Sequence, residues 1–300
     1  MSGLLIETKK KIGSFKNTRK ITKAMELVAA SKMKFFQKKA VHSRIFAHDL
    51  LNILSRNLNG DSVNGLMEQR SEGKTIFILF TSDKGLCGAL NNRLIKGIFQ
   101  SNEWLNTPKE DRLLMTIGKK SLSYALFNKI PVEKSFVSLK ENMTPIDAID
   151  VIGELIKRWE KGDVKQVMMM SPHYKNAFTY YPILKTFLPF SVENLKQHIG
   201  TDSDLKPLKK EENDYMLYEP SEAAVLEHLT RELVNTLFIQ AFFELKASEY
   251  SSRMIAMKNA TDSTNKIIEN LTIDLNKARQ QVITTELADL INSSEAIKDT

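Results

Sequence analysis

The sequence predicts an α/β protein in which two long terminal helices form an antiparallel coiled coil that emerges from a central α/β domain. The first observation behind this is the distribution of helix breakers. All eight prolines lie between Pro108 and Pro220, and no glycine follows Gly200. A helix interior loses about 3 kcal/mol to Pro and about 1 kcal/mol to Gly. Residues 14–59 and 221–300 contain neither and therefore predict long unbroken helices.

The N-terminal segment, residues 1–58, predicts one of the paired helices. An apolar stripe at helical spacing, interrupted by Lys32, consists of Ile21, Met25, Val28 and Phe35. We expect this stripe to face the C-terminal helix. The Gly-, Asn- and Asp-rich stretch Asn59–Gly73 predicts a loop.

The middle segment, residues 74–218, alternates short apolar runs with helical patterns, the second observation behind the fold class. Predicted strands cover Ile76–Phe80, Leu113–Ile117, Ser135–Leu139 and Val167–Met170, with Phe178–Phe187 as a hairpin partner and Tyr215–Tyr218 as a further edge. Predicted helices cover Ala89–Gln100, Lys120–Lys129 and Pro145–Lys161, and the charged stretch Asp202–Asp214 predicts a loop. Such alternation is typical of a Rossmann-like, mainly parallel sheet with helices on both faces.

The C-terminal segment, residues 220–300, predicts the second paired helix. It begins near Ser221, just after Pro220. A heptad pattern follows at Ile268, Leu271, Leu275, Ala278 and Val282. This segment exceeds the N-terminal one by about 30 residues, or about 45 Å of helix. A helix end of that length without a partner is marginal in water, so we expect that it either frays or is covered by a partner.

The net charge of +7 is concentrated at the N-terminus. Residues 1–44 hold twelve Lys or Arg against Glu7 and Glu26, a surplus of ten, which leaves about −3 for the remainder. A basic arm suits an anionic partner: nucleic acid, lipid headgroups or an acidic protein surface. The longest apolar run, Ile76–Phe80, is too short to span a bilayer. Cys87 is the only cysteine, which excludes an internal disulfide and fits a reducing compartment.

The loop Thr81–Gly88 follows a predicted strand and precedes a predicted helix, the usual place of a phosphate-binding loop. It contains neither GxxxxGK[ST] nor GxGxxG. We expect a tight turn that exposes Lys84 and Cys87 to a neighbouring protein. No catalytic triad, metal-ligand spacing or cofactor motif occurs elsewhere, so the sequence predicts a protein without catalytic residues, metal or cofactor.

A basic coiled-coil protein that binds nucleic acid is the alternative. Its lysines would contact phosphates, which suffices for non-specific affinity. The arm carries few aromatic residues for base stacking, and no known nucleic-acid-binding motif is present. This alternative leaves the long C-terminal helix unexplained.

Several motifs resemble a known family. Lys20–Met33 is similar to the N-terminal signature of the γ subunits of F-type ATP synthases. Ala247–Asp262 and Asn276–Leu287 resemble their C-terminal signatures, Ser82–Gly88 resembles their loop after the first strand, and Leu217–Pro220 resembles their entry to the last helix.

The resemblance implies a non-catalytic rotor of the central stalk. Its C-terminal helix would reach into the ring of α and β subunits, and its α/β domain would contact the ε subunit and the c-ring. Rotation would couple proton or sodium flow to ATP synthesis. The absence of a transit peptide favours a bacterial protein, peripheral to the plasma membrane on its cytoplasmic side.

The resemblance also implies contact and coupling residues. Met25 is expected on the seam near Arg279, and a group on the terminal helix is expected to face the seam or the β subunits. This group consists of Arg279, Gln280, Thr284 and Glu286, with Arg253 at a further coupling position. Lys84 and Cys87 are expected to face the moving C-terminal domain of a β subunit. Tyr218 and Glu219 are expected to contact the c-ring.

Overall fold

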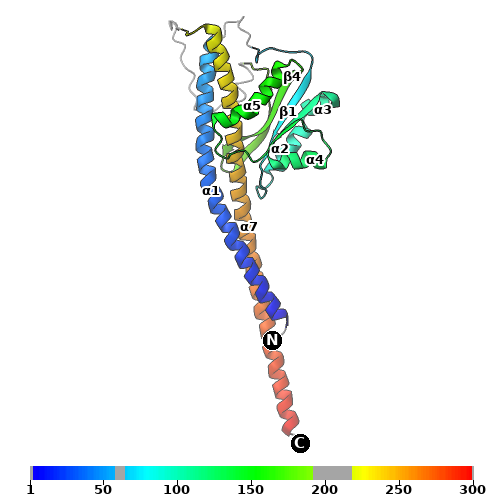
Figure 1. Ribbon diagram of the computed structural model, residues 1–300. Helices are drawn as coiled ribbons and strands as arrows, with labels where there is room; N and C mark the ends of the chain where they lie inside the picture. The colour runs from blue at the N-terminus through cyan, green and yellow to red at the C-terminus, as the bar shows by residue number, and fades with distance from the viewer. Residues whose placement is uncertain (1–2, 58–64, 192–217, 299–300) are drawn as a thin grey trace. The chain divides into compact units, whose positions relative to one another are not determined.

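The computed structural model describes residues 3–57, 65–191 and 218–298, and Figure 1 shows the elements. The chain forms two compact units, one of Met1–Ala29 with Arg253–Thr300 and one of Ala30–Ser252. The boundary between the units falls inside both long helices, α1 (Gly3–Asn57) and α7 (Glu222–Lys298). The division predicted from the sequence, into segments 1–58, 74–218 and 220–300, stays a prediction, because the two units are bounded differently.

In the first unit α1 and α7 run antiparallel. The hydroxyl groups of Thr22 and Thr261 lie 2.8 Å apart, and Arg19 donates to the side-chain oxygen of Asn265 at 3.3 Å. The predicted heptad of α7 is confirmed: its first member is buried and the other four are half-buried. Those residues are Ile268, Leu271, Leu275, Ala278 and Val282.

The stripe predicted for α1 is wrong. Ile21, Val28 and Phe35 are 61%, 57% and 48% exposed, and Met25 is only half-buried. The buried positions of α1 in this unit are instead Leu5, Ile12, Thr22 and Ala29, which are seven or ten residues apart and include large apolar, polar and small side chains. Hydrophobicity alone does not select this face, because apolar residues such as Leu27 and Val28 also lie on the exposed side of α1.

The second unit contains a five-stranded sheet in the order β3-β2-β1-β4-β5. Its strands are β1 (Lys74–Phe80), β2 (Arg112–Ile117), β3 (Lys134–Phe136), β4 (Val164–Asn176) and β5 (Thr179–Leu188). All neighbours are parallel except β4 and β5, which form an antiparallel hairpin. The predicted α/β class is thereby confirmed, although β4 is longer than predicted. The predicted loop Asp202–Asp214 and all but Tyr218 of the predicted strand Tyr215–Tyr218 lie outside the described residues.

The predicted helices correspond to α2 (Leu90–Phe99), α4 (Lys119–Phe127) and α5 (Pro145–Glu160). The start of α5 is fixed by a capping box in which Thr144 and Asp147 exchange hydrogen bonds. Two short elements were not predicted, α3 (Asn102–Asn106) and η1 (Lys109–Asp111). They are shorter than two helical turns, so hydrophobic periodicity cannot reveal them. No helix within the described ranges has a stretch sufficiently long and apolar to cross a membrane.

Alternate residues of β1 face opposite layers, as the strand period requires. Phe77 contacts Trp104 of α3 with ring centroids 4.9 Å apart. Phe80 contacts Phe238 of α7 at 5.4 Å. The sheet therefore buries α7 on the same face as α5.

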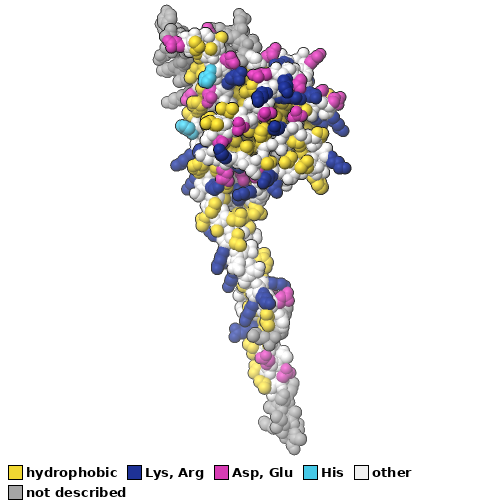
Figure 2. Space-filling view, in the orientation of Figure 1, with side chains coloured by type: hydrophobic (Ala, Val, Ile, Leu, Met, Phe, Trp, Pro, Cys, Tyr) yellow, Lys and Arg dark blue, Asp and Glu magenta, His cyan; other side chains and the backbone are white. Residues whose placement is uncertain are grey.

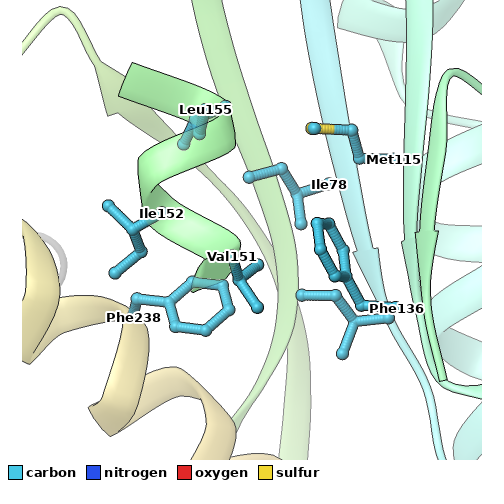
Figure 3. Close-up of a pocket in the computed structure, with 8 residues that line it drawn as sticks. Ile78, Met115, Phe136, Val151, Ile152, Leu155 and Phe238 are labelled. Carbon is cyan, nitrogen blue, oxygen red and sulfur yellow. The ribbon is translucent and has the colours of Figure 1, made fainter. Parts of the chain in front are cut away.

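A small apolar cavity of about 10 Å³ marks where α7, α5 and the sheet meet. In Figure 3, Phe238 points toward α5 and toward the strand side chains. Eight hydrophobic residues line it: Ile78, Met115, Ile117, Phe136, Val151, Ile152, Leu155 and Phe238. A space of this size without polar partners stays dry.

We predict that Phe238→Ala lowers the free energy of unfolding by about 3–5 kcal/mol, because it enlarges this cavity and removes the ring that anchors α7. Denaturant unfolding followed by circular dichroism measures the change. Phe127→Ala is the matched control, since Phe127 is 87% exposed and its loss should stay within about 0.5 kcal/mol. Equal losses in the two variants would show that Phe238 does not anchor the helix.

Candidate functional site

The loop after β1 is held rigidly by its own side chains. Ser82 donates its hydroxyl to the carbonyl of Lys84 at 2.7 Å, and its amide donates to Asn91 at 3.0 Å. The carboxylate of Asp83 accepts from the amides of Lys119 and Ser138 at 3.0 and 3.2 Å. These hydrogen bonds define the conformation of the loop.

This loop exposes Lys84, as predicted, but the expected exposure of Cys87 is wrong. The Cys87 side chain is 2% exposed, and Asn91 donates to its sulfur at 3.2 Å. Its carbonyl accepts from the hydroxyl of Ser252 on α7 at 2.6 Å. Cys87 thus joins the loop to the long helix, and its thiol is not on the surface.

Sequence reasoning missed Leu86 at the tip of this loop. Leu86 has a φ of 61° and is 64% exposed. A leucine in the left-handed region is unusual and persists only where its surroundings impose it. The SDKGLCG motif contains Leu86, but its exposure depends on the backbone conformation, which the motif does not reveal.

A buried ion cluster joins α1, α7 and β4 within the second unit. Glu244 of α7 is 4% exposed. Its carboxylate accepts from Arg44 of α1 at 2.8 Å, from the amide of Tyr174 at 3.1 Å and from Gln240 at 3.0 Å. His173 Nδ1 lies 3.2 Å from the same carboxylate. A single side chain therefore holds both long helices and the sheet.

The electrostatics of the cluster favour the charged form of Glu244. Burial alone would raise its pKa, but the contact with His173 and the charge of Arg44 outweigh burial and lower the pKa to about 2. Burial lowers the pKa of nearby Lys185 to about 8, against the opposing attraction of Glu244. The carboxylate is therefore ionised at neutral pH.

A second polar cluster joins the chain between β3 and α5 to both long helices. Glu141 accepts from Lys32 of α1 and from the hydroxyl of Tyr250 on α7, each at 2.5 Å. The ring of Tyr250 stacks on Phe36 with centroids 5.6 Å apart. Burial, followed by the contact with Glu141, raises the pKa of Tyr250 to about 12. The phenol therefore remains a proton donor across the physiological range.

The expected coupling residues of the long helices are dispersed. Since Thr22 faces Thr261, the antiparallel register puts Met25 beside the stretch of α7 just before Thr261. The expectation that Met25 lies near Arg279 is wrong, because about 18 residues of α7, or about 27 Å, separate Thr261 from Arg279. Arg253 is 7% exposed. Four of the expected residues are exposed on the last turns of α7: Arg279, Gln280, Thr284 and Glu286.

The surface of the first unit is basic. On the face shown in Figure 2, Lys and Arg side chains lie among hydrophobic ones along this unit. The exposed cations of α1 within this unit are Lys9, Lys10, Lys11, Lys16, Lys20 and Lys23. Of these, Lys11 pairs with Glu7 at 2.8 Å and Lys23 with Glu26 at 3.0 Å. Tyr218 is half-buried and Glu219 exposed, immediately before α7.

Among the described residues, no group of His, Cys, Asp and Glu is arranged to hold a metal ion. In the second unit, hydrogen bonds and ion pairs connect both long helices to the sheet and its loops. The first unit exposes a basic surface. Such an arrangement suits mechanical contact with other proteins.

Comparison with known proteins identifies the family. The family model described as ATP synthase matches residues 5–297. The chain belongs to the family of ATP synthase γ chains. The γ chain of Geotalea uraniireducens is 33% identical over 97% of both chains, and that of Neisseria gonorrhoeae is 34% identical over 96% of this chain and 97% of its own.

Solved structures share the fold. A chain of the Euglena gracilis mitochondrial ATP synthase, in an assembly of OSCP, F1 and c-ring, covers 98% of this chain and 95% of its own, with a TM-score of 0.67 and 18% identity. A chain of the Tetrahymena thermophila central stalk and c-ring covers 80% of this chain and 99% of its own, with a TM-score of 0.57 and 25% identity. The long paired helices and the sheet are thus family features.

We predict that Glu244→Gln lowers the free energy of unfolding at pH 7 by about 3–5 kcal/mol, because it leaves the buried Arg44 without its counter-charge. The folded pKa of Glu244 is depressed from 4.5 to about 2. Its stabilising contribution, on the order of 3 kcal/mol, is therefore present above about pH 4.5 and is lost as the pH falls toward 2. The variant should lack this acid-dependent loss.

Denaturant titrations at several pH values measure both effects. Glu227→Gln is the matched control on the same helix, because Glu227 makes an exposed ion pair with Arg231 that is worth at most about 1 kcal/mol. A variant at position 244 that unfolds like this control would contradict a stabilising role for the cluster.

Proposed function

We propose that this chain is the non-catalytic rotor of an F-type ATP synthase central stalk. Its rotation would couple proton or sodium flow through a c-ring to conformational change in the α and β subunits that make ATP. The observation that carries the proposal is the far end of α7. Every described residue from Ile283 to Ile291 is exposed, and several of them are large and apolar.

The helix register explains this exposure. Counting back from the Thr22–Thr261 pair, the first residue of α1, Gly3, lies at the level of about residue 280 of α7. Beyond that level the described residues of the first unit include no second helix beside α7. Leu287, Leu290 and Ile291 are 55%, 67% and 57% exposed. Apolar side chains on a lone helix favour a sheath supplied by other chains.

A ring of α and β subunits is the proposed sheath. The basic surface of α1 would attract acidic loops of the ring by long-range electrostatics, without a fixed socket. The α/β domain would contact the ε subunit and the c-ring, with Tyr218 and Glu219 at the c-ring. The chain would lie peripherally on the cytoplasmic side of a bacterial plasma membrane. Two structural relatives support this arrangement, since one lies in an assembly of OSCP, F1 and c-ring and the other in a central stalk with its c-ring.

The coupling residues keep their proposed roles except for Cys87 and Arg253, whose side chains are buried. Lys84 is exposed on a rigid loop and would face a β subunit. Cys87 would act through its backbone tether to Ser252, since its thiol is buried. Met25 and the exposed group on the last turns of α7, Arg279, Gln280, Thr284 and Glu286, would face the ring along the helix pair. Arg253 is 7% exposed, so it would act from within the helix packing.

We predict that the tagged full-length chain, purified from its host membranes, brings down α and β subunits in equal amounts and in excess over itself. Residues 283–291 should exchange amide hydrogens rapidly in the isolated chain and slowly in the complex. Amides near Leu245, which is buried within the second unit, should exchange slowly in both and serve as the control. Nucleic acid in place of ring subunits would support the alternative of a nucleic-acid-binding protein.

We further predict that Met25→Lys lowers proton pumping per ATP hydrolysed while the complex still assembles. Met25 lies half-buried at the edge of the seam, where a new cation would bind acidic ring residues and resist rotation. Ala24→Lys adds the same charge at an exposed neighbouring position and should have a smaller effect. Pumping per ATP in reconstituted vesicles is the measurement, and an unchanged ratio in Met25→Lys argues against the proposed coupling role.

A further inference from the structure

Two exposed apolar tips project from the second unit. One is Leu86 in the loop after β1, which is 64% exposed. The other is Phe178 in the turn between β4 and β5, which is 77% exposed. Both turns follow the carboxyl ends of parallel neighbouring strands, β1 and β4, so they lie at the same edge of the sheet. Only the loop after β1 has so far been given a proposed partner, a β subunit.

Both turns are tied to adjacent residues of α7. Ser252 donates its hydroxyl to the carbonyl of Cys87 at 2.6 Å, and Ser251 donates to the carbonyl of Ala177. The approach at Ser252 is close, because a Cβ on Gly88 would lie 3.0 Å from its hydroxyl oxygen. Consecutive residues of a helix point about 100° apart at nearly the same height. The two tips are therefore held on neighbouring sides of α7 at one level.

Both tips are also locally fixed. Leu86 has a positive φ, which a leucine adopts only where its surroundings hold it. The amide of Phe178 donates to the side chain of Asn176 at 2.9 Å. A large apolar side chain that is held rigid and exposed is suited to bind another surface.

The surroundings of the tips are basic. Lys84, Lys119, Lys120 and Lys175 are all exposed at this edge of the sheet. Asp83, the acidic residue of the loop, already accepts from the amides of Lys119 and Ser138. A partner that fits must carry acidic side chains beside apolar ones.

We infer that Leu86 and Phe178 together form a two-point docking surface for one acidic, partly apolar segment of a ring subunit. This inference rests on the proposed rotor function and adds the β4–β5 turn to its contacts. Leu86 and Phe178 contact the apolar side chains of the segment, while Lys84 and Lys175 bind its carboxylates. Because both turns are tied to α7, force applied at either tip reaches the long helix directly.

Photo-crosslinking in the complete ATP synthase tests this surface. p-Benzoylphenylalanine replaces Phe178 in one variant, Lys84 in a second and Phe127 in a third. Phe127 is 87% exposed at the end of α4, which returns toward the amino ends of the strands, so it is a matched aromatic control at the opposite edge. We expect a covalent product with an α or β subunit from positions 84 and 178 and none with either from position 127.

The outcomes separate the inference from the proposed function. A ring product from position 84 without one from position 178 overturns the inference and leaves the rotor intact. Products from position 178 with the c-ring or ε alone also overturn it. If ring subunits are missing from the purified complex and position 84 gives no product, the rotor proposal itself fails.

A charge variant adds a second readout. Lys175→Glu should lower the yield of the product from position 178 several-fold, because it repels the acidic segment. Lys161→Glu is the control, since Lys161 is exposed at the end of α5, near the amino ends of the strands. Equal yields in the two charge variants would contradict an acidic partner.

Discussion

The packing of α7 determines the rest of the molecule. From Gln240 to Arg253 every residue of this helix is buried, and this stretch contacts α1, β4, the loop after β1 and the β4–β5 turn. From Met257 to Val282 only one side is buried or half-buried, against α1. From Ile283 to Ile291 all described residues are exposed. One continuous helix thus passes from the core of a domain, through a coiled coil, to a lone end. No single hydrophobic period can describe it.

The two units hold their helices by different chemistry. In the second unit the Glu244 carboxylate accepts from Arg44 of α1 and from the backbone of β4. Removing charges from water is costly, so such a cluster is weak evidence for added stability over an apolar core. It does impose one arrangement, because any slip would leave a buried charge unpaired. In the first unit, the hydroxyl groups of Thr22 and Thr261 form a hydrogen bond between the two helices, and neither group carries a charge.

Helices and strands could be predicted from the sequence, but contacts between residues that are far apart in the sequence could not. The long helices follow from missing Pro and Gly, and α7 begins at Glu222, beside the predicted Ser221. The parallel strands follow from apolar runs. The α1 stripe failed because apolar residues lie on both faces of this helix: Leu5 and Ile12 are buried, whereas Ile21 and Val28 are exposed. Glu244 and Arg44 are 200 residues apart and belong to no motif. The burial of Cys87 depends on contacts with Asn91 and α7 that only the folded chain brings together.

The tethers at Ser251 and Ser252 bear on how a rotor could transmit force. A loop joined to its domain only through its two ends would bend when pushed, because loop backbone is the most compliant part of a fold. Here the loop after β1 and the β4–β5 turn each hydrogen-bond to the side of α7, within the stretch buried on all sides. The clusters around Glu244 and Glu141 connect the same stretch to α1. A force applied at either tip would therefore be transmitted through α7 to α1 and to the sheet.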